Sequence, residues 1–262
     1  MQLSPLHQLP VERRNEEAMP IKWCGIDFGQ TLLEPSGMRT YLIIGDVYKT
    51  LGRPEMIPAA VNRFRILVEF CGNVNILKEA HRDKIKSYVL GGDPQAVSIF
   101  EATEKDYMGV AAGAEEVFLY MRERGISVNI VAELRHTLGD VANNIISQYL
   151  RSKKLTGYFD CLYAPQGKIN LQDGSIDDRY KGKTKESGEL YEMILEYLDE
   201  QDIKPQEMLM VGDQIKTDIN PPRRFGIRTV QYTGYEDLGD SQADHRVSSF
   251  SELREFLKEM GI

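Results

Sequence analysis

The sequence predicts an α/β fold: a doubly wound parallel sheet with helices on both faces and a helical lobe inserted near its start. Two observations carry this prediction. Short apolar runs typical of buried strands alternate with amphipathic stretches of helical period over most of the chain. Between residues 37 and 110 this alternation stops, and helical stretches follow one another with glycine and proline between them.

The expected strands lie at residues 21–26, 126–132, 161–164, 208–211 and 227–232. The expected helices of the core lie at residues 114–124, 141–153, 188–200, 218–225 and 250–260. Ser249 or Ser251 is the expected cap of the last helix. A hairpin is expected within residues 166–181, because Asp173-Gly174 is a typical turn pair. Strands that alternate with helices in this way indicate a parallel, Rossmann-like sheet.

The pattern divides the chain into an arm, a core and a cap. Residues 1–19 are expected to form a flexible N-terminal arm, because they hold prolines and charged residues; they hold no apolar stretch of signal-peptide length. Residues 20–36 and 111–262 are expected to form the α/β core. Residues 37–110 are expected to form the cap, with helices at 38–51, 59–71, 76–90 and 94–107.

Composition narrows the class of protein. A net charge of -8 and a pI near 5.2 argue against a general nucleic-acid binder. No run approaches the roughly 20 apolar residues of a membrane span. The three cysteines have no metal-binding spacing and are typical of a reducing compartment. We therefore expect a cytoplasmic protein without nucleic-acid or membrane partners, whose oligomeric state the sequence does not fix.

Charged residues follow the ends of the expected strands. Asp27 follows the first strand, Ala132-Glu133 closes the second, and Asp213 and Asp218 follow the fourth. Lys185 begins the helix before that fourth strand. Ligands of an open parallel sheet gather at the carboxyl ends of its strands. Carboxylates and a lysine converging there suit a phosphate and Mg²⁺, which prefers carboxylate oxygens and water.

Four motifs in order resemble those of the haloacid dehalogenase (HAD) superfamily. The first is Asp27 to Thr31, and the second is residues 113–125, which resemble the helix before the family's second motif. The third is Lys185 to Tyr191, and the fourth is Gly212-Asp213 with Asp218, followed by residues 225–227. The resemblance covers about residues 20–260, and the helical insert lies where the family's first type of cap lies.

This resemblance implies a role for each matched residue. Asp27 would be the nucleophile that forms an aspartyl-phosphate, and Lys185 would neutralise it and the phosphoryl group. The implied Mg²⁺ ligands are Asp27, the backbone carbonyl of Gly29, Asp213, and Asp218 either through water or as a partner of Lys185. The implied phosphate or substrate contacts come from the strand ends and from the lysine: Thr31, Ala132, Glu133 and Lys185.

Two positions depart from the family's pattern. The family's phosphatases carry a second Asp two residues after the nucleophile, where this chain has Gly29. The second motif ends in Ser or Thr in the family, where this chain has Ala132. Ser127 or Thr137 would be the hydroxyl donor if the alignment were shifted. The chain is therefore expected to lack positioned acid–base catalysis, a contribution of about 10²–10⁴-fold in rate.

The leading hypothesis is a Mg²⁺-dependent phosphohydrolase acting on a small phosphorylated or otherwise anionic metabolite, with impaired acid–base catalysis. Two alternatives stay open, besides a related option, phosphonate cleavage, which would need a cap lysine that forms an imine, with Lys49, Lys78 or Lys84 as nominal candidates. One is a dehalogenase-like C–X hydrolase, because a halide leaves without protonation. The other is a catalytically inactive module that binds phosphate and metal. Residues of the cap that would contact a substrate are not identified by the sequence.

Overall fold

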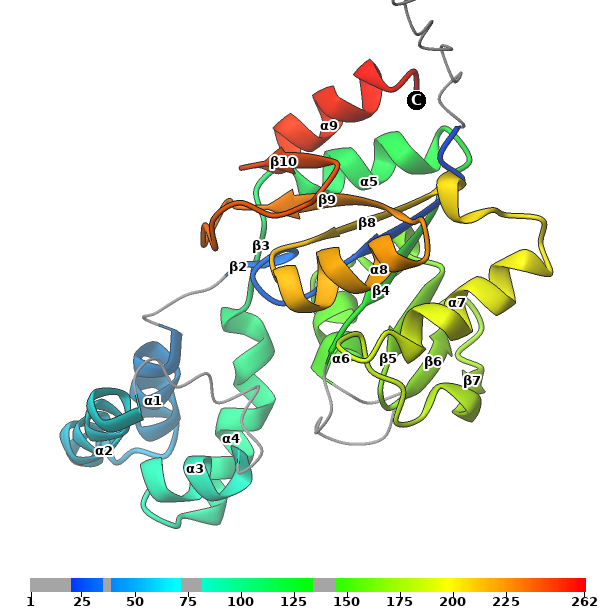
Figure 1. Ribbon diagram of the computed structural model, residues 1–262. Coiled ribbons are helices and arrows are strands. Elements are labelled where there is room, and N and C mark those ends of the chain that lie inside the picture. The colour runs from blue at the N-terminus through cyan, green and yellow to red at the C-terminus, as the bar shows by residue number, and fades with distance from the viewer. Residues whose placement is uncertain (1–19, 35–38, 72–81, 134–144) are drawn as a thin grey trace, which may run out of the picture.

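The computed structural model describes residues 20–34, 39–71, 82–133 and 145–262. Its central feature is an eight-stranded sheet with the order β10-β9-β8-β1-β4-β5-β6-β7 (Figure 1). The strands from β10 to β5 are parallel, and the hairpin of β6 and β7 adds an antiparallel edge. The predicted α/β fold with a mostly parallel sheet is confirmed.

The strands begin and end close to the predicted positions. Their bounds are β1 Trp23–Ile26, β4 Ser127–Val131, β5 Cys161–Ala164, β6 Gly167–Asn170, β7 Ile176–Asp177, β8 Met208–Gly212, β9 Arg228–Tyr232 and β10 His245–Val247. The sequence did not predict β10, whose three residues are too short for a clear alternation. The hairpin turns where Asp173-Gly174 was expected to place it, and Gly174 has a φ of 75°.

Helices cover both faces of the sheet. They are α5 Ala114–Arg122, α6 Ile145–Ser152, α7 Glu189–Asp199, α8 Asn220–Arg224 and α9 Phe250–Glu259. In Figure 1, α5 and α9 lie on one side of the sheet and α7 and α8 on the other. Ser249 rather than Ser251 caps α9, since its Oγ accepts a hydrogen bond from the backbone N of Glu252 at 3.1 Å.

The alternation of side chains in β8 explains why the strand is apolar throughout. Met208 and Met210 pack in a cluster with α7, while Leu209 and Val211 pack in a second cluster with α5, α6 and α9. Successive side chains of a strand point to opposite faces, so a strand covered on both faces must be apolar at every position. β1, which lies inside the sheet between β8 and β4, is likewise buried at every position.

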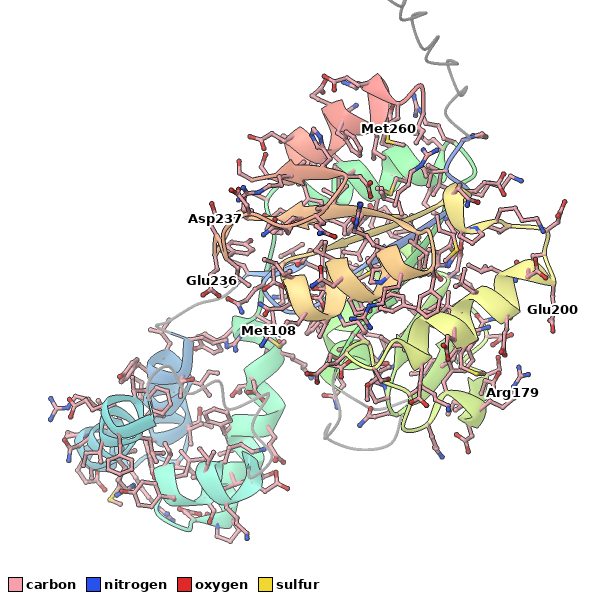
Figure 2. The ribbon with its side chains drawn as sticks, in the orientation of Figure 1. Met108, Arg179, Glu200, Glu236, Asp237 and Met260 are labelled. Atoms are coloured by element: carbon pink, nitrogen blue, oxygen red, sulfur yellow. The ribbon has the colours of Figure 1, made fainter. Side chains whose placement is uncertain are left out.

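The lobe between the first two core strands is helical, as predicted. It contains α1 Arg39–Thr50, α2 Ile57–Cys71, α3 Arg82–Val89 and α4 Pro94–Glu104, which share a hydrophobic core of their own. Two short strands join it to the sheet: β2 Leu33–Glu34 pairs antiparallel with β3 Gly109–Val110. Buried Met108 lies at this junction (Figure 2).

The domain boundaries after residues 36 and 110 stay predictions. The arm over residues 1–19 also stays a prediction, because it lies outside the described residues. No helix in the described part of the chain is long and apolar enough to cross a membrane.

Candidate active site

The predicted site residues meet at one edge of the sheet because three neighbouring strands end there. Strands β8, β1 and β4 are adjacent and parallel, with Ile26 of β1 level with Ile130 and Val211. Asp27 directly follows β1, Ala132 directly follows β4, and Asp213 directly follows β8. The carboxyl ends of these strands therefore carry the residues that the sequence assigned to them.

Lys185 is the centre of the charge network. Its ammonium donates to Asp27 Oδ1 at 2.5 Å, to Asp218 Oδ1 at 2.5 Å and to the Val131 carbonyl at 3.1 Å. Burial opposes the charged form, but Asp218 and Asp27 outweigh it and raise the pKa of Lys185 well above its usual range. An ammonium has three protons to donate, and all three have acceptors here.

Glu133 holds the segment that delivers Lys185. Its Oε2 accepts a hydrogen bond of 2.5 Å from the backbone N of Lys185. The sequence proposed Glu133 as a phosphate or substrate contact. In the structure, this carboxylate fastens the segment before α7 to the end of β4, which fits a positioning role.

Asp218 reaches Lys185 through an unusual turn. Residues Ile215–Ile219 form a π-helix, a rare element that is frequent at functional sites. Asp218 Oδ2 accepts from the backbone N of Gln214 at 2.9 Å, and its carboxylate lies against Gly212. A Cβ on Gly212 would lie 2.4 Å from the Asp218 carboxyl carbon, so only glycine fits there. The hydroxyl of Tyr191 in α7 holds the same turn by donating to the Thr217 carbonyl at 2.8 Å.

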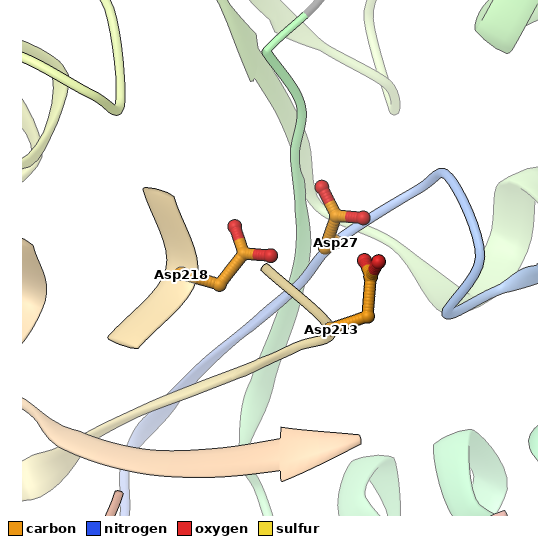
Figure 3. Close-up of side chains that lie close together, drawn as sticks. All are labelled: Asp27, Asp213 and Asp218. Atoms are coloured by element: carbon orange, nitrogen blue, oxygen red, sulfur yellow. The ribbon is translucent and has the colours of Figure 1, made fainter. Parts of the chain in front are cut away.

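Asp213 completes a group of three buried carboxylates. Its Oδ1 accepts from Thr31 Oγ1 at 3.4 Å, and its Oδ2 accepts from the side-chain amide of Gln214. One carboxylate oxygen from each of Asp27, Asp213 and Asp218 lies within 4.8 Å of the others. Figure 3 shows their carboxylates converging from three elements.

These donors suit a hard divalent cation. Carboxylate oxygens are the ligands that Mg²⁺ prefers, and three buried ones close together repel each other unless a cation offsets their charge. Asp218 has both of its oxygens bound by Lys185 and by Gln214. These contacts support the role of Asp218 as a partner of Lys185, and Asp27 and Asp213 are the other two candidate ligands.

The loop after β1 is tightly held at its ends. The backbone N of Asp27 donates to the Val211 carbonyl at 2.8 Å, and the N of Leu32 donates to the Asp27 carbonyl at 3.3 Å. The loop residue in the left-handed region is Gln30, with a φ of 58°, and not Gly29. A positive φ is therefore not the reason for glycine at position 29.

The alternative hydroxyl donor at Ser127 is wrong. Ser127 begins β4, at the opposite end of the strand from Ala132, and its Oγ donates to Asp160 Oδ2 at 2.6 Å. Ala132 is buried directly after β4, at the strand end where the resemblance placed the donor. Thr137, the other alternative, lies outside the described residues.

The sequence analysis missed two residues that organise the site. Gln214 binds both carboxylates of the fourth motif, one through its side chain and the other through its backbone. Tyr191 ties α7 to the π-helix. The only sequence signal for either was position: Gln214 follows Asp213, and Tyr191 ends the third motif.

Comparisons with known proteins bear on one segment of the chain and on its fold. Residues 184–253, which hold Lys185, Asp213 and Asp218, match a family model described as HAD-hydrolase-like. No curated protein matches the chain in sequence. The predicted resemblance is confirmed by this family model and, over most of the chain, by the folds of solved HAD-superfamily structures.

Several of those structures cover almost the whole chain at low identity. A HAD phosphatase from Thermococcus onnurineus has a TM-score of 0.57 and 18% identity, covering 90% of this chain and 98% of its own. A HAD-hydrolase from Bacillus subtilis, described as bound to magnesium, has a TM-score of 0.56 and 14% identity, covering 91% and 99%. A 2-haloacid dehalogenase from Pseudomonas syringae has a TM-score of 0.52 and 16% identity, covering 91% and 99%. At these identities the likeness shows the fold.

Proposed function

We propose that this chain, which has the fold of the HAD superfamily, is a Mg²⁺-dependent phosphohydrolase acting on a small phosphorylated metabolite. The observation that carries the proposal is the ammonium of Lys185 bound between Asp27 and Asp218, with Asp213 beside them. A buried lysine among carboxylates recruits negative charge only weakly on its own. A divalent cation together with Lys185 would offset the charges of Asp27, Asp213 and Asp218, so the site would no longer repel an anionic phosphoryl group.

Asp27 is the nucleophile in this proposal. A carboxylate oxygen of Asp27 attacks phosphorus and forms an aspartyl-phosphate, which water then hydrolyses. Lys185 offsets the charge of Asp27 and of the transferring phosphoryl group, because the pair is buried and water screens it little. Bound Mg²⁺ would reduce the repulsion between the anionic nucleophile and the anionic substrate. Asp27 and Asp213, with the Gly29 carbonyl, would hold it.

The direct test is phosphate release from a panel of small phosphorylated metabolites with Mg²⁺. Asp27→Asn removes the nucleophile and should abolish release. Asp199→Asn is the matched control, because it makes the same change of charge at an exposed residue of α7. Release that Asp27→Asn leaves intact would contradict the proposal, provided that circular dichroism shows both variants folded.

The metal part of the proposal has its own measurement. Titration calorimetry with Mg²⁺ should show binding to the unaltered chain and much weaker binding to Asp213→Asn. The control is Asp240→Asn, whose carboxylate is exposed and pairs with Arg246. Equal binding to all three proteins would place the cation elsewhere.

One rival function has a specific observation in its favour. Gly29 supplies no acid, and a carbon–halogen bond breaks without protonation of the leaving group. A dehalogenase-like hydrolase would release halide from a halogenated acid in the presence of chelator, since it needs no cation. The proposed phosphohydrolase would show no halide release and would lose phosphate release in chelator.

A binding module without catalysis is the remaining rival. It would bind Mg²⁺ and inorganic phosphate by calorimetry but release no phosphate from any substrate. Binding with no turnover across the whole panel, in a folded chain, would favour this rival.

A further inference from the structure

We infer that the site selects phosphoryl donors whose leaving group departs without a proton, such as aryl and acyl phosphates, and discriminates against alkyl phosphates. This inference rests on the proposed phosphohydrolase function and specifies its substrate class. The hydrogen-bond partners of the charged side chains at the three strand ends support it.

The loop that carries the nucleophile offers no second acid. From Asp27 to Leu33, Asp27 is the one titratable side chain. The Phe28 ring packs against Tyr149, with ring centroids 5.2 Å apart, and the Thr31 hydroxyl donates to Asp213. Gln30 is a neutral amide. Gly29 and Gln30 are the half-buried residues of a loop that is otherwise buried as far as Leu33, so the loop opens toward solvent where an acid is missing.

The neighbouring carboxylates already have partners of their own. Asp218 accepts from Lys185 and from the backbone of Gln214. Glu133 accepts from the backbone of Lys185, and Asp213 accepts from Thr31 and Gln214. Each therefore acts as an acceptor within the network.

Lys185 cannot serve as the acid without breaking the site. Its three donors are committed to Asp27, Asp218 and the Val131 carbonyl. Transfer of one proton to a leaving group would leave two buried carboxylates beside a neutral amine. Lys185 and the three neighbouring carboxylates are therefore each committed to partners within the site rather than to a leaving oxygen.

The preference for leaving groups that need no proton follows from the bonds that form and break. An Asp27 oxygen forms a bond to phosphorus, and the bond from phosphorus to the leaving oxygen breaks, with its electron pair going to that oxygen. A carboxylate or aryloxide is stable with this charge and takes up a proton later from solvent. An alkoxide is far more basic and depends on a proton during bond breaking, which positioned acids supply with a gain of about 10²–10⁴-fold.

The second half of the reaction lacks the matching base. Water attacks the phosphorus of the aspartyl-phosphate, inorganic phosphate and the Asp27 carboxylate are released, and the proton of the water goes to phosphate or solvent. With a good leaving group, the first step is fast and this second step is slow. The phosphorylated chain should then accumulate, giving a burst of leaving group of about one equivalent per chain.

The test compares phenyl phosphate with benzyl phosphate, which share a ring and differ in the acidity of the leaving group. The quantity is kcat/KM with Mg²⁺, because it reports phosphoryl transfer even when dephosphorylation limits turnover. For the unaltered chain, kcat/KM should favour phenyl phosphate strongly. Gly29→Asp should reduce this preference by on the order of 10²–10⁴-fold, by accelerating benzyl phosphate.

Gly29→Asn is the matched control, since it adds a side chain of the same size without an acidic proton. It should leave the preference unchanged. His136 follows the second expected strand and lies outside the described residues, so His136→Gln tests whether this imidazole supplies the proton; this variant should also leave the preference unchanged. If Gly29→Asp does not fold, the slope of kcat/KM across para-substituted phenyl phosphates in the unaltered chain gives the same answer.

The outcomes separate the two levels of the proposal. A preference for phenyl phosphate that Gly29→Asp removes, with a burst and a phosphoryl mass on the chain, supports both. Equal use of phenyl and benzyl phosphate by the unaltered chain overturns the inference and leaves the phosphohydrolase standing. Loss of the preference in His136→Gln also overturns the inference. No phosphate release from any substrate overturns the proposed function, and the inference with it.

Discussion

The two sides of this site differ in what their side chains can do. On the β8 side, Asp213, Gln214 and Asp218 form a dense network with Lys185. On the side formed by the ends of β1 and β4, Gly29 and Ala132 carry no polar side chain. The difference teaches that binding of charge and transfer of protons are separate properties: the described residues of the β8 side offer groups for the first, and Gly29 and Ala132 offer none for the second.

The largest expected effect comes from breaking the network at its centre. Lys185→Met leaves Asp27 and Asp218 buried without their cation, which should lower the free energy of unfolding by about 3–5 kcal/mol. The exposed neighbour Lys183→Met should change it by less than about 0.5 kcal/mol. Urea unfolding measures both.

The pH dependence of Lys185→Met adds a second check. Its unpaired carboxylates should have pKa values above those of the unfolded chain, so their protonation stabilises the folded state. The loss of stability should therefore shrink as pH falls and grow as pH rises through those pKa values. A loss that is independent of pH would mean that repacking, rather than uncompensated charge, causes it.

The next largest effect is expected from restoring a hydroxyl at the end of β4. Ala132→Ser places a donor where the family carries one, and kcat/KM should rise by up to about 10²–10³-fold, the size measured for donors at oxyanion sites. Ala164→Ser at the end of neighbouring β5 is the matched control, because Ala164 is equally buried. It should cost stability without a gain in rate. Equal rates in both variants would show that residue 132 does not face the phosphoryl group.

A smaller effect on stability is expected from a larger side chain at Gly212, at the end of β8. Gly212→Ala puts a methyl group against the Asp218 carboxylate and should lower the free energy of unfolding by about 1–3 kcal/mol. Gly157→Ala, where no atom lies within 4 Å of the added carbon, should be nearly neutral. If thermal unfolding shows the same change for both, the close approach of Asp218 to Gly212 does not hold in solution.

The smallest effect concerns the partner of Asp213. Gln214→Ala removes the side-chain donor to that carboxylate and should weaken Mg²⁺ binding by about 10-fold or somewhat more, the lower end for groups that orient metal ligands. Gln201→Ala, an exposed amide bonded to the Tyr197 carbonyl, is the control. Calorimetry that gives equal affinities for both would show that Gln214 does not orient the ligand.

The sequence predicted the architecture where a pattern repeats. Strand β5 was predicted at its observed bounds, and β8 to within one residue, because buried strands are apolar throughout. β10 was not predicted, because three residues are too few to show an alternation of apolar and polar side chains. The two-stranded ribbon of β2 and β3 was not predicted, because its pairing joins residues that lie far apart in the chain.

The candidate site was predicted where residue type and strand end coincide, as at Asp27 and Asp213. The role of Glu133 could not be predicted, because its hydrogen bond to the Lys185 backbone depends on tertiary placement. The roles of Gln214 and Tyr191 could not be predicted either, because their contacts depend on a π-helix that the local sequence pattern does not predict. Whether a positive φ calls for glycine at position 29 could likewise be decided only from the φ angles of the loop, which place Gln30 and not Gly29 in the left-handed region.

The most direct test of the account is to find where the phosphoryl group goes. The chain is mixed with acetyl phosphate and Mg²⁺, quenched in acid within the first turnover, digested, and mapped by mass spectrometry. The account predicts one phosphoryl group on the peptide that contains Asp27, and none in Asp27→Asn. A phosphoryl group on another residue, or none in a folded chain that releases phosphate, would contradict it.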